Sequence, residues 1–218
     1  MFDTLAPYIP ALAQGFLLTL FYFALGTVGS MVLGLPVALA LGSPSAIVRF
    51  PAVAFVEFFR NTPLLVQLFW LHFALPALTG FNTTAQQTGG IALVIVMTAY
   101  MAEVYRTGFN SVARGQHEAA LALGLNPRQR WRLVVIPQAL AMTMPAIGNT
   151  LVSLLKATAI LSILAVPELM RTTSRISDYT ADPILFYSVA ALIYIGTGLA
   201  LAGGLHRLEV RLNRWRHR

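Results

Sequence analysis

The sequence predicts an all-α integral membrane protein, a bundle of five transmembrane helices, and three observations support this fold class. Of the 218 residues, 57% are apolar and only 11% are charged, with a mean hydropathy of +0.70. Five apolar stretches are each long enough to cross a bilayer, and the arginines gather in short blocks between them. A soluble domain of this length needs more polar surface than this chain has, so lipid must cover part of it.

The five stretches each contain the roughly 20 apolar residues that a helix needs to cross a membrane. In chain order, we predict spans at Leu12–Leu41, Pro51–Leu78, Gly90–Phe109, Gln138–Val166 and Pro183–Leu205. Glycines and prolines within them are tolerated where neighbouring helices pack closely. Residues 1–218 therefore form a single transmembrane domain.

The arginines predict the orientation of the spans, because short cytoplasmic loops retain positive charge. Arg49 follows the first span. The group after the third span is Arg106, Arg114, Arg128, Arg130 and Arg132, and the group after the fifth span is Arg207, Arg211, Arg214, Arg216 and Arg218. The N-terminus is therefore expected outside and the C-terminus inside the cell. The net charge of +7 follows this topology and does not indicate nucleic-acid binding.

Residues 110–137, which we call the coupling loop, are too polar to be a span but have the pattern of two short helices. Gly124 is a helix stop, and the next helix begins with Asn126 as N-cap, Pro127 at the first position and Gln129 closing a capping box. Alanine and glycine give the loop a small-residue face that a partner surface can approach closely.

The motif Glu118-Ala119-Ala120, then Gly124, then Ile136-Pro137, resembles the EAA loop in permease subunits of ABC importers. The wider run from Glu103 through Gly115 to Leu125 is similar to the polar amino acid branch of that family. So are the segments Phe59–Gln67, with Asn61 where that branch usually has glycine, and Ser153–Thr158. The resemblance covers nearly the whole chain and implies a type I ABC importer permease fold.

In that family the loop forms a coupling helix that docks on the ATPase subunit. The resemblance therefore implies that this chain contacts an ATPase through Gly115, Glu118, Ala119, Ala120 and Gly124. It also implies three partners, namely an ABC ATPase dimer, an identical or paralogous second permease chain and an extracytoplasmic solute-binding protein. The location that it implies is a bacterial cytoplasmic (inner) membrane. The other interpretation of the loop is an amphipathic helix on the membrane surface.

The chain is not expected to be an enzyme or to bind a metal or cofactor itself. A phosphate-binding P-loop needs Gly-Lys-Ser/Thr, whereas the one lysine, Lys156, follows Leu155. ATP and Mg therefore belong to the partner ATPase. His117-Glu118 begins like a zinc-protease motif, but Leu121 occupies the place of the second histidine.

Polar residues within the predicted spans are candidates for the solute path, because a charge at mid-membrane costs about 2.5–3.5 kcal/mol unless it faces a bundle interior or water. The candidates for the translocation pathway or substrate binding are Arg60, Gln67, Glu103, Asn149, Ser153 and Lys156. Glu57, Arg60, Leu64 and Gln67 have the spacing of one helical face, and so do Asn149, Ser153 and Lys156. Glu103 and Arg106 can pair across one turn.

Two interpretations stay open for these charges. Lys156 either meets a solute carboxylate or pairs with Glu57 or Glu103, and Arg60 and Glu103 either line the path or hold and gate the helices. Arg171 and Arg175 in the last external loop are candidate contacts for a binding protein.

The function expected is a permease subunit for a polar amino acid or similar small solute, opines and compatible solutes included. An ion-coupled secondary transporter is the alternative.

Overall fold

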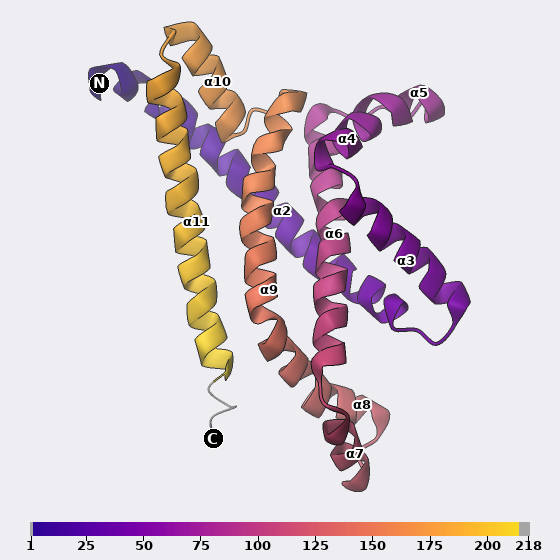
Figure 1. The fold of residues 1–218 in the computed structure, drawn as a ribbon. Helices are drawn as coiled ribbons and strands as arrows, with labels where there is room; N and C mark the ends of the chain where they lie inside the picture. Colours follow the sequence, from indigo (N-terminus) through magenta and orange to yellow (C-terminus); the bar gives the residue numbers. More distant parts are fainter. Residues whose placement is uncertain (1, 214–218) are drawn as a thin grey trace.

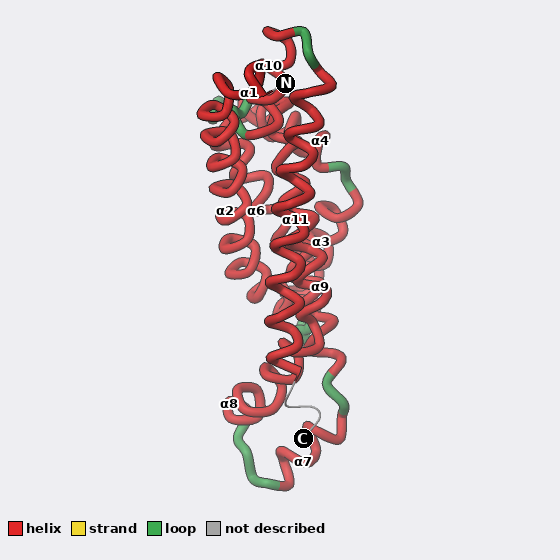
Figure 2. The backbone as a smooth tube through the Cα atoms, turned by 90° about the vertical axis from the view of Figure 1, so that its left-hand side faces the viewer, coloured by secondary structure: helices red, strands yellow, loops and turns green. Residues whose placement is uncertain are grey.

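The computed structural model describes residues 2–213 and is helical, with no strand in that range (Figures 1 and 2). The long helices are α2 (Ile9–Leu41), α3 (Ala46–Asn61), α6 (Ala85–Ser111), α9 (Ile136–Ala157), α10 (Leu169–Thr180) and α11 (Pro183–Asn213). The shorter ones are α1 (Phe2–Leu5), α4 (Leu64–Phe69), α5 (Leu75–Thr79), α7 (Arg114–Ala122) and α8 (Pro127–Arg130). Short 3-10 or π segments join several of them: η1 (Ala6–Tyr8), η2 (Trp70–Ala74), η3 (Trp131–Val135) and η4 (Thr158–Leu164).

The predicted spans correspond to helices that are long and apolar enough to cross a membrane. Within residues 2–213, four such helices are continuous, and the bent pair Ala46–Asn61 with Leu64–Thr79 makes a fifth span if its two halves are taken together. The predicted multi-span helical bundle is therefore confirmed. Of the predicted C-terminal arginines, Arg214, Arg216 and Arg218 lie outside the described residues.

The second span differs from the prediction, because the chain bends by 108° between its two helical halves. Thr62 has an extended backbone (φ −105°, ψ 138°), as the residue before a proline prefers, and Pro63 cannot donate to the preceding turn. The prediction that Glu57, Arg60, Leu64 and Gln67 form one helical face was wrong, since the break separates the first two residues from the last two.

The helix after the coupling loop also differs from the prediction. Residues Pro127–Leu164 form one continuous helical span, whereas we predicted a separate short helix and a span starting at Gln138. The π turn η3 ends where the Ile136 N–H bonds to the Trp131 carbonyl, directly before Pro137. A π turn widens the helix, which lets a proline follow without a break. The turn η2 precedes Pro76 in the same way.

Helix α2 crosses the bundle obliquely and packs on α6 (Figure 1). Its buried face carries small residues at intervals of four, including Gly26, Ser30, Gly34 and Ala38. A side chain at Gly34 would meet the Met101 Cβ of α6 at 3.0 Å. Small residues thus allow the two backbones to approach closely, as is typical of membrane helix pairs.

The main core lies where α2, α6 and α9 meet, and α11 packs on the outer side of α9. Leu93, Met101, Leu154 and Leu161 are fully buried there. The opposite face of α2 is apolar and exposed, for example at Leu17, Val28 and Val32. In a membrane this face contacts lipid, so the bundle is apolar both inside and out.

Helix α10 lies at the end of the bundle that is opposite to α7 and α8 (Figure 1). Glu168 caps it by accepting hydrogen bonds from the backbone N–H groups of Met170 (3.0 Å) and Arg171 (2.7 Å). The same buried carboxylate accepts from Tyr194 in α11 (2.9 Å) and Thr19 in α2 (3.4 Å). One side chain therefore ties three helices together at this end.

Candidate functional site

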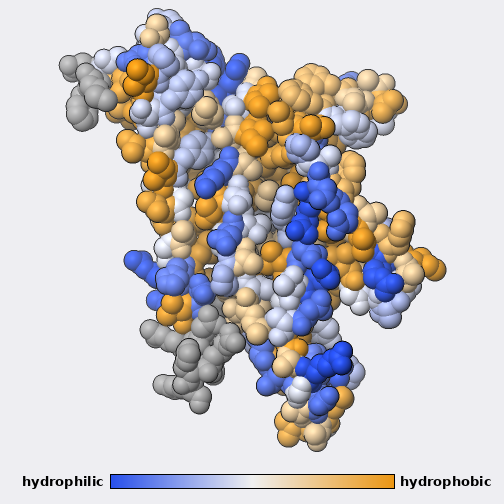
Figure 3. Space-filling view, in the orientation of Figure 1, coloured by the Kyte–Doolittle hydropathy of each residue, from blue (hydrophilic) through white to orange (hydrophobic). Residues whose placement is uncertain are grey.

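Two neighbouring cavities lie on the face formed by α9, α6 and the end of α3. The first has a volume of about 390 Å³ and is lined by both apolar and uncharged polar side chains, among them Thr62, Tyr100, Asn149, Thr150 and Ser153. The second has a volume of about 220 Å³ and includes Arg60, Glu103, Thr107 and Ser111 in its wall. Figure 3 shows hydrophilic surface along α9 and along the groove between α6 and α3, whereas apolar surface covers α4 and α5.

Tyr100 lines both cavities and so marks the boundary between them. The Arg60 guanidinium carbon lies 5.6 Å from the centre of the Tyr100 ring, and the Tyr100 hydroxyl donates to the Arg60 carbonyl at 3.5 Å. A cation over an aromatic face is stabilised by the ring quadrupole. Our sequence predictions omitted Tyr100, although its position one turn before Glu103 places it on the same helical face.

Glu103 and Arg106 form an ion pair on α6, which confirms that these two charges pair across one turn. Both Arg106 Nε and Nη2 donate to the Glu103 carboxylate. The bidentate geometry is the strongest arrangement for an arginine and a carboxylate. Glu103 still lines the smaller cavity, whereas Arg106 also reaches a cavity of about 270 Å³ between α2, α6 and the coupling loop.

Gln67 lies inside the bend of the second span, with only 4% of its surface exposed. Its Nε2 donates to the carbonyls of Phe59 (3.1 Å) and Thr62 (2.9 Å), which the helix break leaves without their usual partners. Its Oε1 is buried and has no partner in the described residues. Gln67 therefore holds the bend, and it does not line either of the two cavities.

Asn149, Ser153 and Lys156 are all exposed on one face of α9, as their spacing predicts. The Ser153 hydroxyl donates to the Asn149 carbonyl within the helix (2.8 Å). Lys156 lies outside the walls of both cavities, and it forms no ion pair with Glu57, Glu103 or another described residue. The ion-pair interpretation of Lys156 is therefore not seen in this structure.

The coupling loop extends beyond the bundle, as α7 and α8 show at the foot of Figure 2. Gly124 has the left-handed φ of +71° that favours glycine, and the Leu125 N–H bonds back to the Ala120 carbonyl (3.1 Å). The Asn126–Gln129 capping box is present in both directions. The predicted helix stop at Gly124 and the predicted helix start at Asn126 are confirmed, although the second helix continues into α9.

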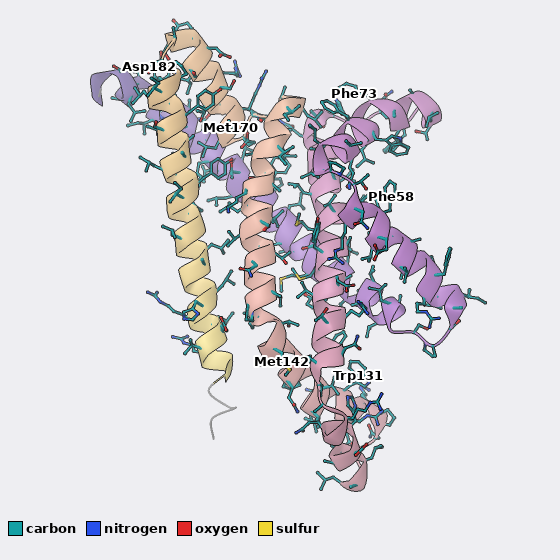
Figure 4. The ribbon with its side chains drawn as sticks, in the orientation of Figure 1. Phe58, Phe73, Trp131, Met142, Met170 and Asp182 are labelled. Carbon is teal, nitrogen blue, oxygen red and sulfur yellow. The ribbon has the colours of Figure 1, made fainter. Side chains whose placement is uncertain are left out.

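The exposed face of the loop differs in one residue from the prediction. Gly115, Glu118, Ala119 and Gly124 are exposed, but Ala120 is only 2% exposed because it faces the rest of the loop. The loop is fixed at its root, where the Trp131 ring meets Phe109 of α6 edge-on at 5.3 Å (Figure 4). The Gln138 amide also donates to Gln116 (3.1 Å), which links α9 to α7.

The two arginines of α10 differ in exposure, since Arg175 is exposed and Arg171 is half-buried. The buried face of α10 holds Leu169, Thr173, Ile176 and Ser177. The helix thus lies with one side on the bundle and with Arg175 and Tyr179 outward.

A further cavity of about 740 Å³, between α2 and the start of α6, is mainly apolar and lies away from these polar groups. No cluster of three or more His, Cys, Asp or Glu side chains suited to a metal occurs among residues 2–213.

A multi-span helical bundle with a polar, cavity-lined face and a protruding helical loop is the architecture expected of a membrane permease. The sequence of residues 34–214 matches the family described as the binding-protein-dependent transport system inner membrane component. The match covers most of the chain, so the protein belongs to this family, and the predicted resemblance to permease subunits of ABC importers is confirmed.

Several relatives match this chain over most of their length. The chain is 38% identical to a probable amino-acid ABC transporter permease protein of Sinorhizobium fredii, across 94% of this chain and 88% of the relative. It is 34% identical to the probable glutamine ABC transporter permease protein GlnM of Bacillus subtilis, across 98% and 97%. The fold matches the solved structure titled "Crystal structure of an amino acid ABC transporter with histidines" with a TM-score of 0.90 and 34% identity, across 97% and 98%.

Proposed function

We propose that this chain is the permease subunit of an ATP-binding-cassette importer for a polar amino acid or a similar small solute. The observation that carries the proposal is the combination of a polar, cavity-lined face with a protruding coupling loop on one continuous helix, α8 through α9. Relatives named for amino acids or glutamine support this choice of solute class. The transport step itself requires no reaction within this chain.

A second permease chain, identical or paralogous, completes the solute path. The cavities lie on an open face, where Asn149, Ser153 and Tyr100 are exposed. Polar groups of this kind are stable in a membrane only if they face protein or water. A second bundle packed against α9, α6 and α3 would enclose them in a shared pathway lined by Arg60, Glu103, Asn149, Ser153 and, at its edge, Lys156.

An ABC ATPase dimer docks on the coupling loop. Leu121 and Leu123 are exposed at its surface, although the loop lies beyond the apolar spans. Exposed large apolar residues outside lipid mark interaction sites. Together with Gly115, Glu118, Ala119 and Gly124 they offer a surface that a groove on the ATPase can cover. Two of the predicted site residues are buried instead: Ala120 supports the shape of the loop, and Gln67 supports the bend of the second span.

The solute arrives from a binding protein outside the cytoplasmic (inner) membrane of a bacterium. The α10 helix lies at the end opposite the coupling loop, so the exposed Arg175 and the half-buried Arg171 are placed to contact that protein. ATP and Mg bind to the ATPase partner, whose closure moves the loop. Coupling then depends on different contacts in the two states of the transporter.

Reconstituted transport tests this proposal. We expect liposomes holding this chain, its second permease chain and the ATPase to take up radiolabelled L-glutamine, L-histidine, L-arginine or L-glutamate only with ATP and a binding protein. Glu118→Trp and Gly124→Trp should abolish uptake with normal insertion, whereas Leu192→Trp, on the exposed side of α11, should not. Uptake driven by an ion gradient without ATPase would instead support a secondary transporter.

A further inference from the structure

We propose that Arg60 and Glu103 form a head-group site that binds the carboxylate and the ammonium group of a zwitterionic amino acid. The inference rests on the proposed transport function and names the part of the solute that is recognised. Both residues line the cavity of about 220 Å³, and they come from different helices, α3 and α6. The site therefore presents a cation and an anion to the same small space.

Arg60 has the chemistry of a carboxylate receptor. It forms no ion pair with any residue that the structure describes, and its side chain makes no hydrogen bond there. Its guanidinium lies over the Tyr100 ring, and a cation–π contact leaves the N–H groups free. The Arg60 charge acts on Glu103 across the cavity without forming a direct ion pair with it. An arriving carboxylate can therefore supply a direct partner through the planar guanidinium fork.

Glu103 has the chemistry of an ammonium receptor. Arg106 holds its carboxylate in a fixed orientation through two N–H donors. A carboxylate has about four lone-pair positions, so the pair leaves acceptor capacity for a further donor. The same carboxylate lines the cavity that Arg60 lines, whereas Arg106 is absent from that wall. Glu103 can thus accept a solute ammonium without losing its ion pair.

The neighbouring cavity accommodates the rest of the solute. It shares Tyr100 with the head-group site and has a volume of about 390 Å³, and none of its lining residues is charged. Its polar groups are the hydroxyl and amide side chains of Thr62, Tyr100, Asn149, Thr150 and Ser153. This division predicts charge recognition of the head group and hydrogen-bond recognition of a neutral polar side chain. Lys156, outside both walls, does not provide the carboxylate contact.

Analogue binding to the assembled transporter tests the inference. The probes are radiolabelled L-glutamine, L-histidine, L-arginine and L-glutamate, measured in nanodiscs without the binding protein, in competition with the α-carboxamide and the N-acetyl derivative of each. We expect the best-bound amino acid to compete about tenfold or more better than its carboxamide, as a lost charge-assisted hydrogen bond predicts. The amino acid should also compete about tenfold or more better than its N-acetyl derivative, because acetylation removes the ammonium charge.

The variants assign each preference to one residue. Arg60→Ala should remove the preference over the carboxamide, Arg60→Lys should restore part of it, and Glu103→Gln should remove only the preference over the N-acetyl compound. Arg49→Ala, at the exposed start of α3, is the matched control for loss of an arginine and should bind as the natural chain does. Restoration by lysine separates recognition from misfolding.

Two results would overturn the inference. One is an Arg60→Ala variant that still discriminates against the carboxamide, and the other is loss of that discrimination in Lys156→Ala instead. In either case, ATP-driven uptake by the unaltered assembly would leave the proposed transport function standing. Absence of such uptake, with intact binding preferences, would remove the transport proposal alone.

Discussion

The charged side chains of the bundle are stabilised in three different ways. Glu103 and Arg106 neutralise each other, Arg60 lies over an aromatic ring, and Glu168 is surrounded by hydrogen-bond donors. Each arrangement reduces the cost of holding a charge away from water. Arg60 and Tyr100 link α3 to α6, whereas the Glu168 cluster links α2, α10 and α11. Glu168 itself lies between the apolar spans that end at Leu164 and begin at Pro183.

Removing the Glu168 carboxylate should destabilise the fold. In Glu168→Ala, the N–H groups of Met170 and Arg171 and the hydroxyl of Tyr194 lose their acceptor. Each buried donor left unpaired costs about 1–3 kcal/mol, and 1 kcal/mol corresponds to roughly 2–4 °C for a chain of this size. We expect the unfolding temperature in detergent to fall by on the order of 10 °C, with Asp178→Ala, an exposed carboxylate of α10, as the control. A change within error would show that the cluster adds no stability.

The same carboxyl predicts a pH dependence of stability. Burial raises the pKa of Glu168, although the backbone N–H groups of Met170 and Arg171 oppose this effect. The folded state therefore holds the proton more tightly than the unfolded state, so the stability from this group is complete below the ordinary pKa of 4.5 and decreases as pH rises through the raised value. We expect Glu168→Gln to show a flatter unfolding temperature across this pH window than the natural chain. Parallel curves for the two proteins would contradict this assignment.

At the scale of elements, the coupling loop separates residues that hold its shape from residues that face a partner. Ala120 is buried and its carbonyl accepts the hydrogen bond that closes α7, whereas Ala119 is exposed one position earlier. Gly124 is free of steric contact, since a side chain there would meet no atom within 4 Å. Its left-handed φ is the reason for glycine, and a partner surface can approach it closely.

These adjacent alanines provide a matched pair of substitutions. Ala120→Leu should lower the unfolding temperature, because overpacking a filled site costs about 1–3 kcal/mol. Ala119→Leu should leave the unfolding temperature unchanged but weaken co-purification of the ATPase and reduce ATP-driven uptake. Thermal unfolding and pull-down of the two variants measure both effects. The opposite pattern, a stable Ala120→Leu that retains the ATPase and an unstable Ala119→Leu, would contradict the assignment of the two faces.

The sequence predicted which segments cross the membrane better than it predicted their internal shape. Hydropathy identified the segments of the four continuous candidate spans and of the bent pair, and Gly124 and Asn126 identified the end of one loop helix and the start of the next. The break at Pro63 was missed because prolines such as Pro36 and Pro145 remain inside continuous helices here. What distinguishes Pro63 is tertiary: the Gln67 amide turns back to the carbonyls that the break exposes. The local sequence pattern does not indicate this contact between the Gln67 side chain and the backbone of the preceding helix.

Predictions of the site were limited by the same dependence on tertiary structure. Spacing correctly placed Asn149, Ser153 and Lys156 on one face of α9 and paired Glu103 with Arg106. Only the packing of α3 on α6 brings Arg60 to Tyr100 and divides the polar face into two cavities. Glu168 was not among the residues singled out from the sequence, although it is fully buried and contacts three helices.

At the scale of the whole molecule, the two ends of the bundle have different tasks. One end holds α10, packed on α2 and α11, and the other holds α7 and α8 (Figure 1). The continuous helix from Pro127 to Leu164 runs from the loop past the polar face. A rigid helix of this length can transmit a displacement of the loop to Asn149 and Ser153, so the proposed mechanism requires the loop and α10 on opposite sides of the membrane.

The absence of cysteine from the sequence makes this arrangement directly testable. Leu123 of the coupling loop and Tyr179 of α10 are 79% and 83% exposed, so Leu123→Cys and Tyr179→Cys introduce single accessible thiols without disturbing the core. In right-side-out membrane vesicles, we expect an impermeant maleimide to label Tyr179→Cys at once and Leu123→Cys only after permeabilisation. This result follows from arginine retention on the cytoplasmic side. Labelling of Leu123→Cys in intact vesicles would place the coupling loop outside the cell, where no ATPase has access to ATP, and the proposed transport mechanism would fail.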